Sequence, residues 1–443
     1  MVKRALAWFA AAWLGLGCSS NGRDAQPQTL VLRGFHLVDV ASRSVREGDV
    51  LIENGVVVAR PTLASAQVVE GHGAYLMPAL WDLKASLWGN DSALSYEVLD
   101  QQANFTQCLG MHLYYGVAHV GVFAMNREWV DRELKRADAL GIAAAESFYP
   151  DRVMCAKQAH GCDIIADIAG ARAALAERVQ HQAPLIYVAF AQEGKGSMPG
   201  VTREVLAEVL SGAAKQRIPT VVVVGEWAKA EEAVQLGGNV IYGFPEGPIP
   251  DALLELMRAR GVAFAPALVR YLELDRLLGN EPAFMDPFLA VTLQPQVRDT
   301  YRNEKDLWQG WRPELVIGRA RRASMLQNVQ RAVKAGVPVV AVSDAGWVAG
   351  AFQGYGSHAN QAWLERAGLN GWDRLAAATV WPAAVLGRRV GFDAGEAADF
   401  VALAANPLEK AQNLRQIAWV MRKGQVVNRD KLLPDLTRDV YRP

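Results

Sequence analysis

Two side chains that could carry acyl-transfer chemistry lie on one apolar stretch, YLMPALWDLKASL, at residues 75–87. Its composition is typical of a buried strand, and alternate residues of a strand point to the same side. Lys84 and Ser86 therefore share a face, where the serine could act as a nucleophile and the lysine as its base, as Ser–Lys pairs do in some hydrolases. No oxyanion hole can be recognised near them in the sequence, so this is one reading among several.

The cysteines are a second set of reactive groups. Cys155 and Cys162 enclose the short loop CAKQAHGC, which could close as a disulfide in an oxidising compartment and leave Cys108 reduced. The alternative is a metal site that uses His160. Only this histidine lies between the two cysteines, and no CxxC pair exists elsewhere, so the disulfide is the prediction.

The N-terminus, MVKRALAWFAAAWLGLGCSS, has the order of an export signal: two cations, a short apolar run, then small residues ending at Cys18. The run is too short to span a bilayer. Residues 1–17 resemble a bacterial lipoprotein signal, which implies lipid on Cys18, and residues 18–28 are small and polar like a flexible tether. We expect a membrane-anchored protein facing the periplasm, and Ser19 favours the outer membrane. The alternative for residues 1–17 is a buried helix.

Composition limits the class of protein and its partners. The chain has 443 residues, of which 51% are hydrophobic and 21% charged, so it can bury a large core. Lys plus Arg and Asp plus Glu both number 46, without a basic run, which gives no sign of a nucleic-acid surface. The partners we expect are a small-molecule ligand and, through Cys18, a membrane.

Short apolar runs alternate with helical stretches through the middle of the chain, a pattern that favours parallel strands joined by crossover helices. Eight such alternations predict an α/β fold, a (β/α)8 TIM-like barrel, over residues 76–388. A doubly wound open sheet is the alternative, but no Gly-rich phosphate loop supports it. The eight runs are YLMPALWDL, GVAHVGVF, GIAAAESF, PLIYVAF, PTVVVVG, GNVIYGF, GVAFAPAL and VPVVAVS.

The ends of the chain contain short alternating strands. Residues 29–75 and 389–430 are predicted to pair into one small β-sandwich domain, and residues 431–443 to form a C-terminal tail. Residues 268–320 interrupt the alternation of strands and helices. An insertion after the seventh barrel strand would lie at the mouth, so we expect it to act as a lid.

The chain resembles the metal-dependent amidohydrolase superfamily, in particular its imidazolonepropionase and Xaa-Pro dipeptidase-like branch. The resemblance spans residues 29–428. It implies a barrel with a small β-sandwich, hydrolysis of carbon–nitrogen bonds, and zinc or another divalent metal. The stretches that carry it are GDVLIENGVVVA, GAYLMPALWDL, AATVWPAAVLG, DAGEAADFVALAANPLE and WVMRKGQVV.

The metal ligands implied by this resemblance are largely replaced. The first strand of the family ends in Asp-x-His-x-His, and here Asp82 is kept while Lys84 and Ser86 stand at the histidines. Asp344 stands where the family has a metal-binding aspartate that is also the general base. Zinc at a catalytic site needs about three protein ligands, and an ammonium group repels a cation. We therefore expect no metal cofactor, and expect the Lys84 ammonium to take the metal's place and pair with Asp344. Alternatively, Asp344 only caps the next helix.

Three further side chains are candidate ligand-binding residues by the same resemblance. Tyr187 stands near the family's carboxylated lysine, Tyr242 lies in the sixth run, and His358 lies on the helix after the last strand, where packing or solvation is the alternative. No histidine falls between His181 and His358, so the fifth and sixth strands lack theirs.

Three functions are compatible with these residues. The first is a lipoprotein whose barrel binds a ligand or partner without turnover. The second is a metal-independent hydrolase of amide or cyclic amide bonds that uses Ser86 and Lys84. The third is a hydrolase with a different site, or with a metal bound through the insertion.

Overall fold

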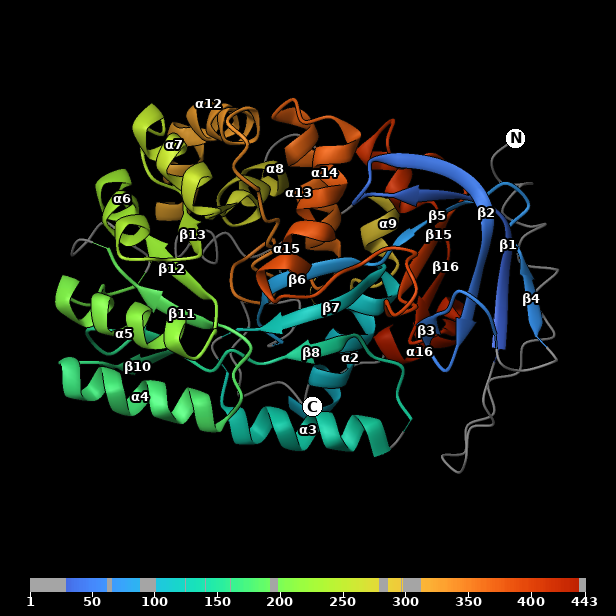
Figure 1. Ribbon diagram of the computed structural model, residues 1–443, viewed down its shortest axis with the longest axis horizontal. Coiled ribbons are helices and arrows are strands. Elements are labelled where there is room, and N and C mark those ends of the chain that lie inside the picture. Colours follow the sequence, from blue (N-terminus) through green and yellow to red (C-terminus); the bar gives the residue numbers. More distant parts are fainter. Residues whose placement is uncertain are drawn as a thin grey trace.

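The computed structural model describes residues 29–61, 66–87, 101–123, 125–139, 141–159, 161–191, 198–278, 286–295, 297 and 312–437 (Figure 1). The signal-like segment, Cys18, the tether and His160 lie outside these ranges. Within them, no helix has both the length and the apolar character needed to cross a bilayer.

Two parallel sheets carry the central part of the chain. One has the order β6-β7-β8, and the other has the order β10-β9-β11-β12-β13-β14. Their strands are short, and apolar residues occupy most of their positions, as expected for strands covered on both faces. The strands are β6 (Leu80–Ala85), β7 (Val117–Val122), β8 (Glu146–Phe148), β9 (Val153–Cys155), β10 (Cys162–Ile164), β11 (Ile186–Ala189), β12 (Thr220–Val224), β13 (Val240–Gly243) and β14 (Ala263–Pro266).

Helices follow these strands as crossover connections (Figure 1). Several begin at side-chain N-caps: for example, Asp167 accepts from the main-chain N–H of Gly170, and Thr202 accepts from that of Val205. Another ends at Gly261, whose φ of 65° is the left-handed conformation that glycine adopts without strain. The helices are α2 (Gln101–Tyr114), α3 (Arg127–Ala139), α4 (Ile168–Gln180), α5 (Arg203–Lys215), α6 (Trp227–Gln235), α7 (Asp251–Arg260) and α12 (Arg312–Lys334).

The eighth predicted strand is only partly formed. Residues 337–345 join β14 to β6 through two isolated parallel bridges, Phe264 with Val339 and Ala85 with Ala345. The side chain of Asp82 replaces a main-chain partner there, because its Oδ1 accepts from the N–H of Ser343 at 3.1 Å.

The opposite junction differs from a closed barrel as well. Among the described residues no strand pairing joins β8 to the six-stranded sheet, because β9 occupies the edge of β11 through the pair Val188 and Met154. The prediction of parallel α/β architecture is confirmed, but main-chain hydrogen bonds do not close the eight segments into a continuous ring.

The disulfide of Cys155 and Cys162 links β9 to β10, as predicted, and Cys108, buried in α2, takes no part in a disulfide.

Both ends of the chain contribute to one further sheet, of eight strands. Its order is β17-β16-β15-β5-β1-β2-β3, and β4 also pairs with β1. Its apolar core includes Leu32, Phe35, Phe400 and Met421. We call it the chain-end sheet. Its strands are β1 (Thr29–Asp39), β2 (Ser44–Glu53), β3 (Val56–Val57), β4 (Gln67–Glu70), β5 (Tyr75–Pro78), β15 (Phe400–Leu403), β16 (Ile417–Arg422) and β17 (Gln425–Val427).

Short helices complete the described fold. Part of the predicted insertion is helical, starting with a π-helical turn that two residues separate from the end of β14. The expected C-terminal tail contributes residues 431–437 to a helix that packs against α2. These elements are η2 (Val269–Glu273), α8 (Leu274–Leu278), α9 (Pro287–Ala290), α13 (Tyr355–Arg366), α14 (Gly371–Ala377), α15 (Val380–Val385), η4 (Ala411–Arg415) and α16 (Arg429–Thr437).

Candidate functional site

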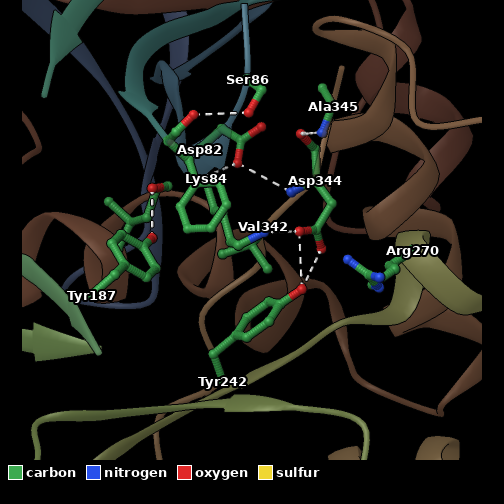
Figure 2. Close-up of polar contacts among 12 residues, drawn as sticks. Asp82, Lys84, Ser86, Tyr187, Tyr242, Arg270, Val342, Asp344 and Ala345 are labelled. Carbon is green, nitrogen blue, oxygen red and sulfur yellow. Dashed lines mark hydrogen bonds and ion pairs between the residues drawn. The ribbon is translucent and has the colours of Figure 1, made fainter. Parts of the chain in front are cut away.

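A buried ion pair between Lys84 and Asp344 forms the centre of the site (Figure 2). Lys84 lies near the end of β6, and its side chain is 2% exposed, while that of Asp344 is fully buried. The main chains are also joined, since the N–H of Asp344 donates to the carbonyl of Lys84 at 3.0 Å. Burial lowers the pKa of Lys84, and the adjacent Asp344 acts against that effect. The predicted pairing of these two side chains is confirmed.

The backbone at Asp344 is held in a conformation that few residues adopt. Its φ is 53°, in the left-handed region, where aspartate is tolerated better than most side chains. The turn is fixed locally, because the N–H of Ala345 is bound by the hydroxyl of Ser343 at 3.0 Å and the N–H of Trp347 donates to the carbonyl of Asp344 at 3.1 Å. This turn directs the carboxylate toward β6.

Aromatic side chains surround the charged pair. The hydroxyl of Tyr242, from β13, lies 2.9 and 3.0 Å from the two carboxylate oxygens of Asp344. The Lys84 ammonium lies 3.9 Å from the ring centre of Phe123 and 4.8 Å from that of Tyr242, within the range of cation–π attraction. Both charges of the pair therefore have a second partner besides each other, and neither side chain is more than 2% exposed.

The other two predicted residues of this cluster bond to main-chain oxygens. The hydroxyl of Tyr187, from β11, donates to the carbonyl of Leu83 at 2.9 Å. The hydroxyl of Ser86 donates to the carbonyl of Phe123 at 2.8 Å, and Ser86 is fully buried. The structure therefore gives the Ser86 proton a structural acceptor and pairs Lys84 with Asp344, an arrangement unlike a nucleophile and its base.

Asp82, two residues before Lys84 on β6, lies in an unusual environment. Its Oδ1 accepts from the N–H groups of Lys84 and Ser343, but Oδ2 is buried without a hydrogen bond in the described part of the chain. Burial is the main cause that raises its pKa to about 6. Nε2 of His112 lies 3.9 Å from that oxygen, and burial lowers the pKa of His112 to about 4. The two side chains therefore approach each other as neutral groups near pH 5.

A cavity of about 600 Å³ opens beside the cluster, at the carboxyl ends of β12, β13 and β14. Tyr242 lines it and also reaches Asp344, so it separates the cavity from the ion pair. Arg270, in the π-helical turn, lines it too, is 7% exposed, and points toward Asp344 in Figure 2. Its Nη2 donates to Glu314 at 3.2 Å. Other lining residues are Glu226, Trp227, Phe244, Glu246, Tyr271 and Arg321.

His358 is not part of this cluster. It lies in α13, 2% exposed, with Nε2 2.7 Å from the carbonyl of Tyr115 and its ring against Phe288. Burial lowers its pKa to about 3, so it is a neutral packing residue. The expectation that it lines the ligand cavity is not met, because α9 covers it with Phe288.

Sequence reasoning missed Arg270, Phe123 and Trp347, which all contact or face the charged pair. Arg270 could have been identified as a site residue from its position shortly after the seventh predicted strand, because side chains there face the barrel mouth. Phe123 directly follows β7 and could have been identified in the same way. Nothing in the sequence marks Trp347, because the turn after Asp344 sets the direction of its side chain.

The divalent metal implied by the resemblance does not fit this cluster. The Lys84 ammonium already neutralises Asp344, and both carboxylate oxygens of Asp344 accept from Tyr242. Ser86 and Tyr187 stand where histidine and carboxylated lysine would be needed, and their hydroxyls are bound to carbonyls. One carboxylate cannot hold a catalytic zinc ion, which needs about three protein ligands.

Comparison with known proteins gives family and fold. No curated protein sequence matches the chain. Solved structures with a similar fold include a Xaa-Pro dipeptidase with bound methionine in the active site (16% identity, TM-score 0.69, covering 90% of this chain and 100% of the other). They also include A. niger ochratoxinase (17%, 0.69, 91% and 96%) and molinate hydrolase (14%, 0.70, 92% and 96%). The model of the amidohydrolase family matches residues 188–427, more than half of the sequence, and the chain belongs to that family.

Proposed function

We propose that this amidohydrolase-family protein binds a small-molecule ligand at the mouth of its parallel strands without hydrolysing it. The observation that carries the proposal is the buried pair of Lys84 and Asp344. The family normally uses a divalent metal, and here an ammonium group neutralises the one carboxylate that stands at a ligand position. A metal ion bound to Asp344 would displace the Lys84 ammonium and leave that buried charge without a partner, which is costly.

The cavity supports ligand binding. At about 600 Å³ it lies in the usual size range for small-molecule sites. Aromatic rings and a few charged groups line it, including the stacked pair of Phe244 and Tyr271, whose ring centres are 4.6 Å apart. It opens at the carboxyl ends of the strands, where enzymes of this type of fold bind their substrates.

Hydrolysis of carbon–nitrogen bonds is the second candidate function, and family membership favours it. The names of the structural neighbours, a dipeptidase and molinate hydrolase among them, belong to hydrolases. Against a Ser86 nucleophile stands the hydrogen bond from its hydroxyl to the carbonyl of Phe123. Against Lys84 as its base stands the ion pair of Lys84 with Asp344, so a hydrolase built on this chain would need a different nucleophile and a different base.

A lipid anchor at Cys18 is also part of the proposal. The cationic start, the short apolar run and the cysteine that follows it support export and acylation, and Ser19 supports retention in the outer membrane. The tether at residues 18–28 would hold the binding domain close to the membrane on its periplasmic side.

The test combines metal analysis, turnover and binding on the purified mature protein. We expect no metal that depends on Asp344, so its metal content should equal that of the Asp344→Asn variant. We also expect no hydrolysis of Met-Pro or N-acetyl-methionine above the buffer rate. The same two compounds serve as probes for binding, which calorimetry measures. Arg270→Ala, which alters the lining of the cavity, tests whether any binding occurs there. Turnover, or a metal lost on Asp344→Asn, would contradict the proposal.

A further inference from the structure

Three side chains with metal-binding atoms meet at the other end of the strands, away from the cavity. His119 is the third residue of β7, Glu146 is the first of β8 and lies opposite it in register, and Asp399 directly precedes β15. In Figure 1 the arrows of β7 and β8 point away from the chain-end sheet, so their first residues face it. The cluster therefore lies where the parallel strands join that sheet.

The donor atoms of the cluster are close and mostly buried. Nδ1 of His119 is 3.0 Å from Oε2 of Glu146, and its Nε2 is 3.1 Å from Oδ2 of Asp399. One donor atom from each side chain lies within 4.8 Å of the others. The side chains of His119 and Asp399 are only 4% and 5% exposed.

Two of these atoms are not satisfied by the protein. Nδ1 of His119 and Oδ2 of Asp399 are buried and make no hydrogen bond of acceptable geometry within the described part of the chain. The short contacts around the ring are thus misdirected for hydrogen bonding, although they are close enough for ligands that share an ion. Buried polar atoms in native proteins are nearly always bonded, so unbonded ones in one cluster point to a bound species.

The other carboxylate oxygens of Glu146 and Asp399 contact groups outside the cluster. Oε1 of Glu146 lies 3.3 Å from Arg388, and Oδ1 of Asp399 lies 3.4 Å from Arg422 and accepts from the N–H of Lys423. Each carboxylate therefore has one oxygen held by a cationic side chain and the other turned toward His119, and Arg422 also lies 3.5 Å from the Glu146 oxygen on that side. Trp81 stacks on the imidazole at 3.8 Å and fixes its plane. Hydrogen-bonded carboxylates and an oriented imidazole are the usual support of metal ligands.

We propose that His119, Glu146 and Asp399 bind one divalent transition-metal ion of the zinc class. An imidazole nitrogen with two carboxylate oxygens is a ligand set for Zn²⁺ or Co²⁺, whereas Mg²⁺ and Ca²⁺ prefer oxygen alone. Ligand distances of about 2.0–2.2 Å require the three side chains to close in around the ion. A cavity of about 70 Å³, lined by all three, provides the space. Arg388 and Arg422 reduce the affinity without removing the ligands.

The site would fasten the two parts of the fold together. Its ligands come from β7, β8 and the chain-end sheet, so the ion would link elements far apart in sequence. This role is structural, because the cluster lies at the opposite end of the strands from the cavity.

The test uses the mature protein after dialysis against a chelator. We expect Co²⁺ titration to give visible absorption bands that saturate at one ion per chain, and ZnSO₄ to displace the cobalt. His119→Ala and Glu146→Gln should abolish the bands, while His181→Ala, which removes a partly exposed histidine elsewhere, should retain them. Glu146→Gln preserves volume, so it keeps the test valid if His119→Ala does not fold.

The outcomes separate this site from the proposed function. No saturable binding, or binding equal in Glu146→Gln and the wild type, would overturn the metal site and leave the proposed function standing. Metal that persists in Glu146→Gln and disappears in Asp344→Asn would overturn both. In the first of these cases the cluster is only a set of polar contacts between His119 and the two carboxylates.

Discussion

Lys84 and Asp344 lie 260 residues apart and are joined twice, once through their main chains and once through their side chains. The first contact helps to bring residues 337–345 against β6, and the second neutralises the carboxylate that the same turn buries. One pair of residues thus contributes both to the junction between the first and eighth segments and to the charge balance within it. Loss of the ammonium should therefore affect the stability of the whole parallel part.

Lys84→Met is expected to reduce the free energy of unfolding by about 3–5 kcal/mol, because it leaves the Asp344 carboxylate buried without a cation. Urea denaturation followed by circular dichroism measures the change. The double variant Lys84→Met with Asp344→Leu should recover much of the loss, since no buried charge then remains.

The control for this prediction is Lys229→Met, which breaks a partly exposed ion pair with Glu232. It should cost at most about 1 kcal/mol. If Lys84→Met were no more destabilising than Lys229→Met, the buried pair would not be a strong stabilising contact.

Asp82 and His112 should give opposite dependences of stability on pH. Because the folded pKa of Asp82 is raised to about 6, the folded state holds a proton that the unfolded state loses, and stability falls as pH rises from about 4 to 6. The pKa of His112 is lowered to about 4, so its contribution rises with pH from about 4 to 6.5. Each amounts to about 3 kcal/mol at most, and the two nearly cancel.

Asp82→Asn should therefore reveal the contribution of His112. Relative to the wild type, the variant is expected to gain up to about 3 kcal/mol of stability between pH 4 and pH 6.5. Denaturation at both pH values measures this difference. An equal pH dependence in the two proteins would mean that Asp82 is not protonated in the folded state near pH 5.

The strand pattern predicted most of the parallel fold because fully apolar runs bounded by helices have few alternative structures. It failed at VPVVAVS, which has the composition of a strand but is bent by the turn at Asp344 and bonded to the Asp82 side chain. Neither effect is local in sequence. The β9 and β10 pair beside β11 was also missed, since two three-residue strands carry no periodic signal.

The same limit applies to the sites. Lys84 and Ser86 could be placed on one face from their spacing, and the pairing of Lys84 with Asp344 followed from the order of strands in a barrel. The positions of His119, Glu146 and Asp399 in the sequence do not indicate that the three side chains meet, because two come from neighbouring strands and the third from the far end of the chain. Only the packing of the chain-end sheet brings them together.

Cys18→Ser should abolish membrane attachment if the N-terminus is a lipoprotein signal. Without the thiol no lipid can be added, so the variant should stay unprocessed or be released, and labelled palmitate should enter only the wild type. Cys108→Ser is the matched control, because that buried thiol lies in α2 and its loss should leave labelling unchanged. Palmitate label in Cys18→Ser, or none in the wild type, would contradict the anchor.

Tyr242→Phe and Tyr187→Phe remove one hydroxyl each from buried rings of the same cluster, so they form a matched pair. The Tyr242 hydroxyl donates to a carboxylate and the Tyr187 hydroxyl to a main-chain carbonyl. A hydrogen bond to a charged acceptor contributes about 1.5–3 kcal/mol, and one to a neutral acceptor about 1 kcal/mol. Tyr242→Phe should thus be the more destabilising by urea denaturation, and it alone should alter binding in the cavity, because only Tyr242 lines it. Equal losses in the two variants would show that Tyr242 does not stabilise the Asp344 carboxylate more than an ordinary buried hydrogen bond does.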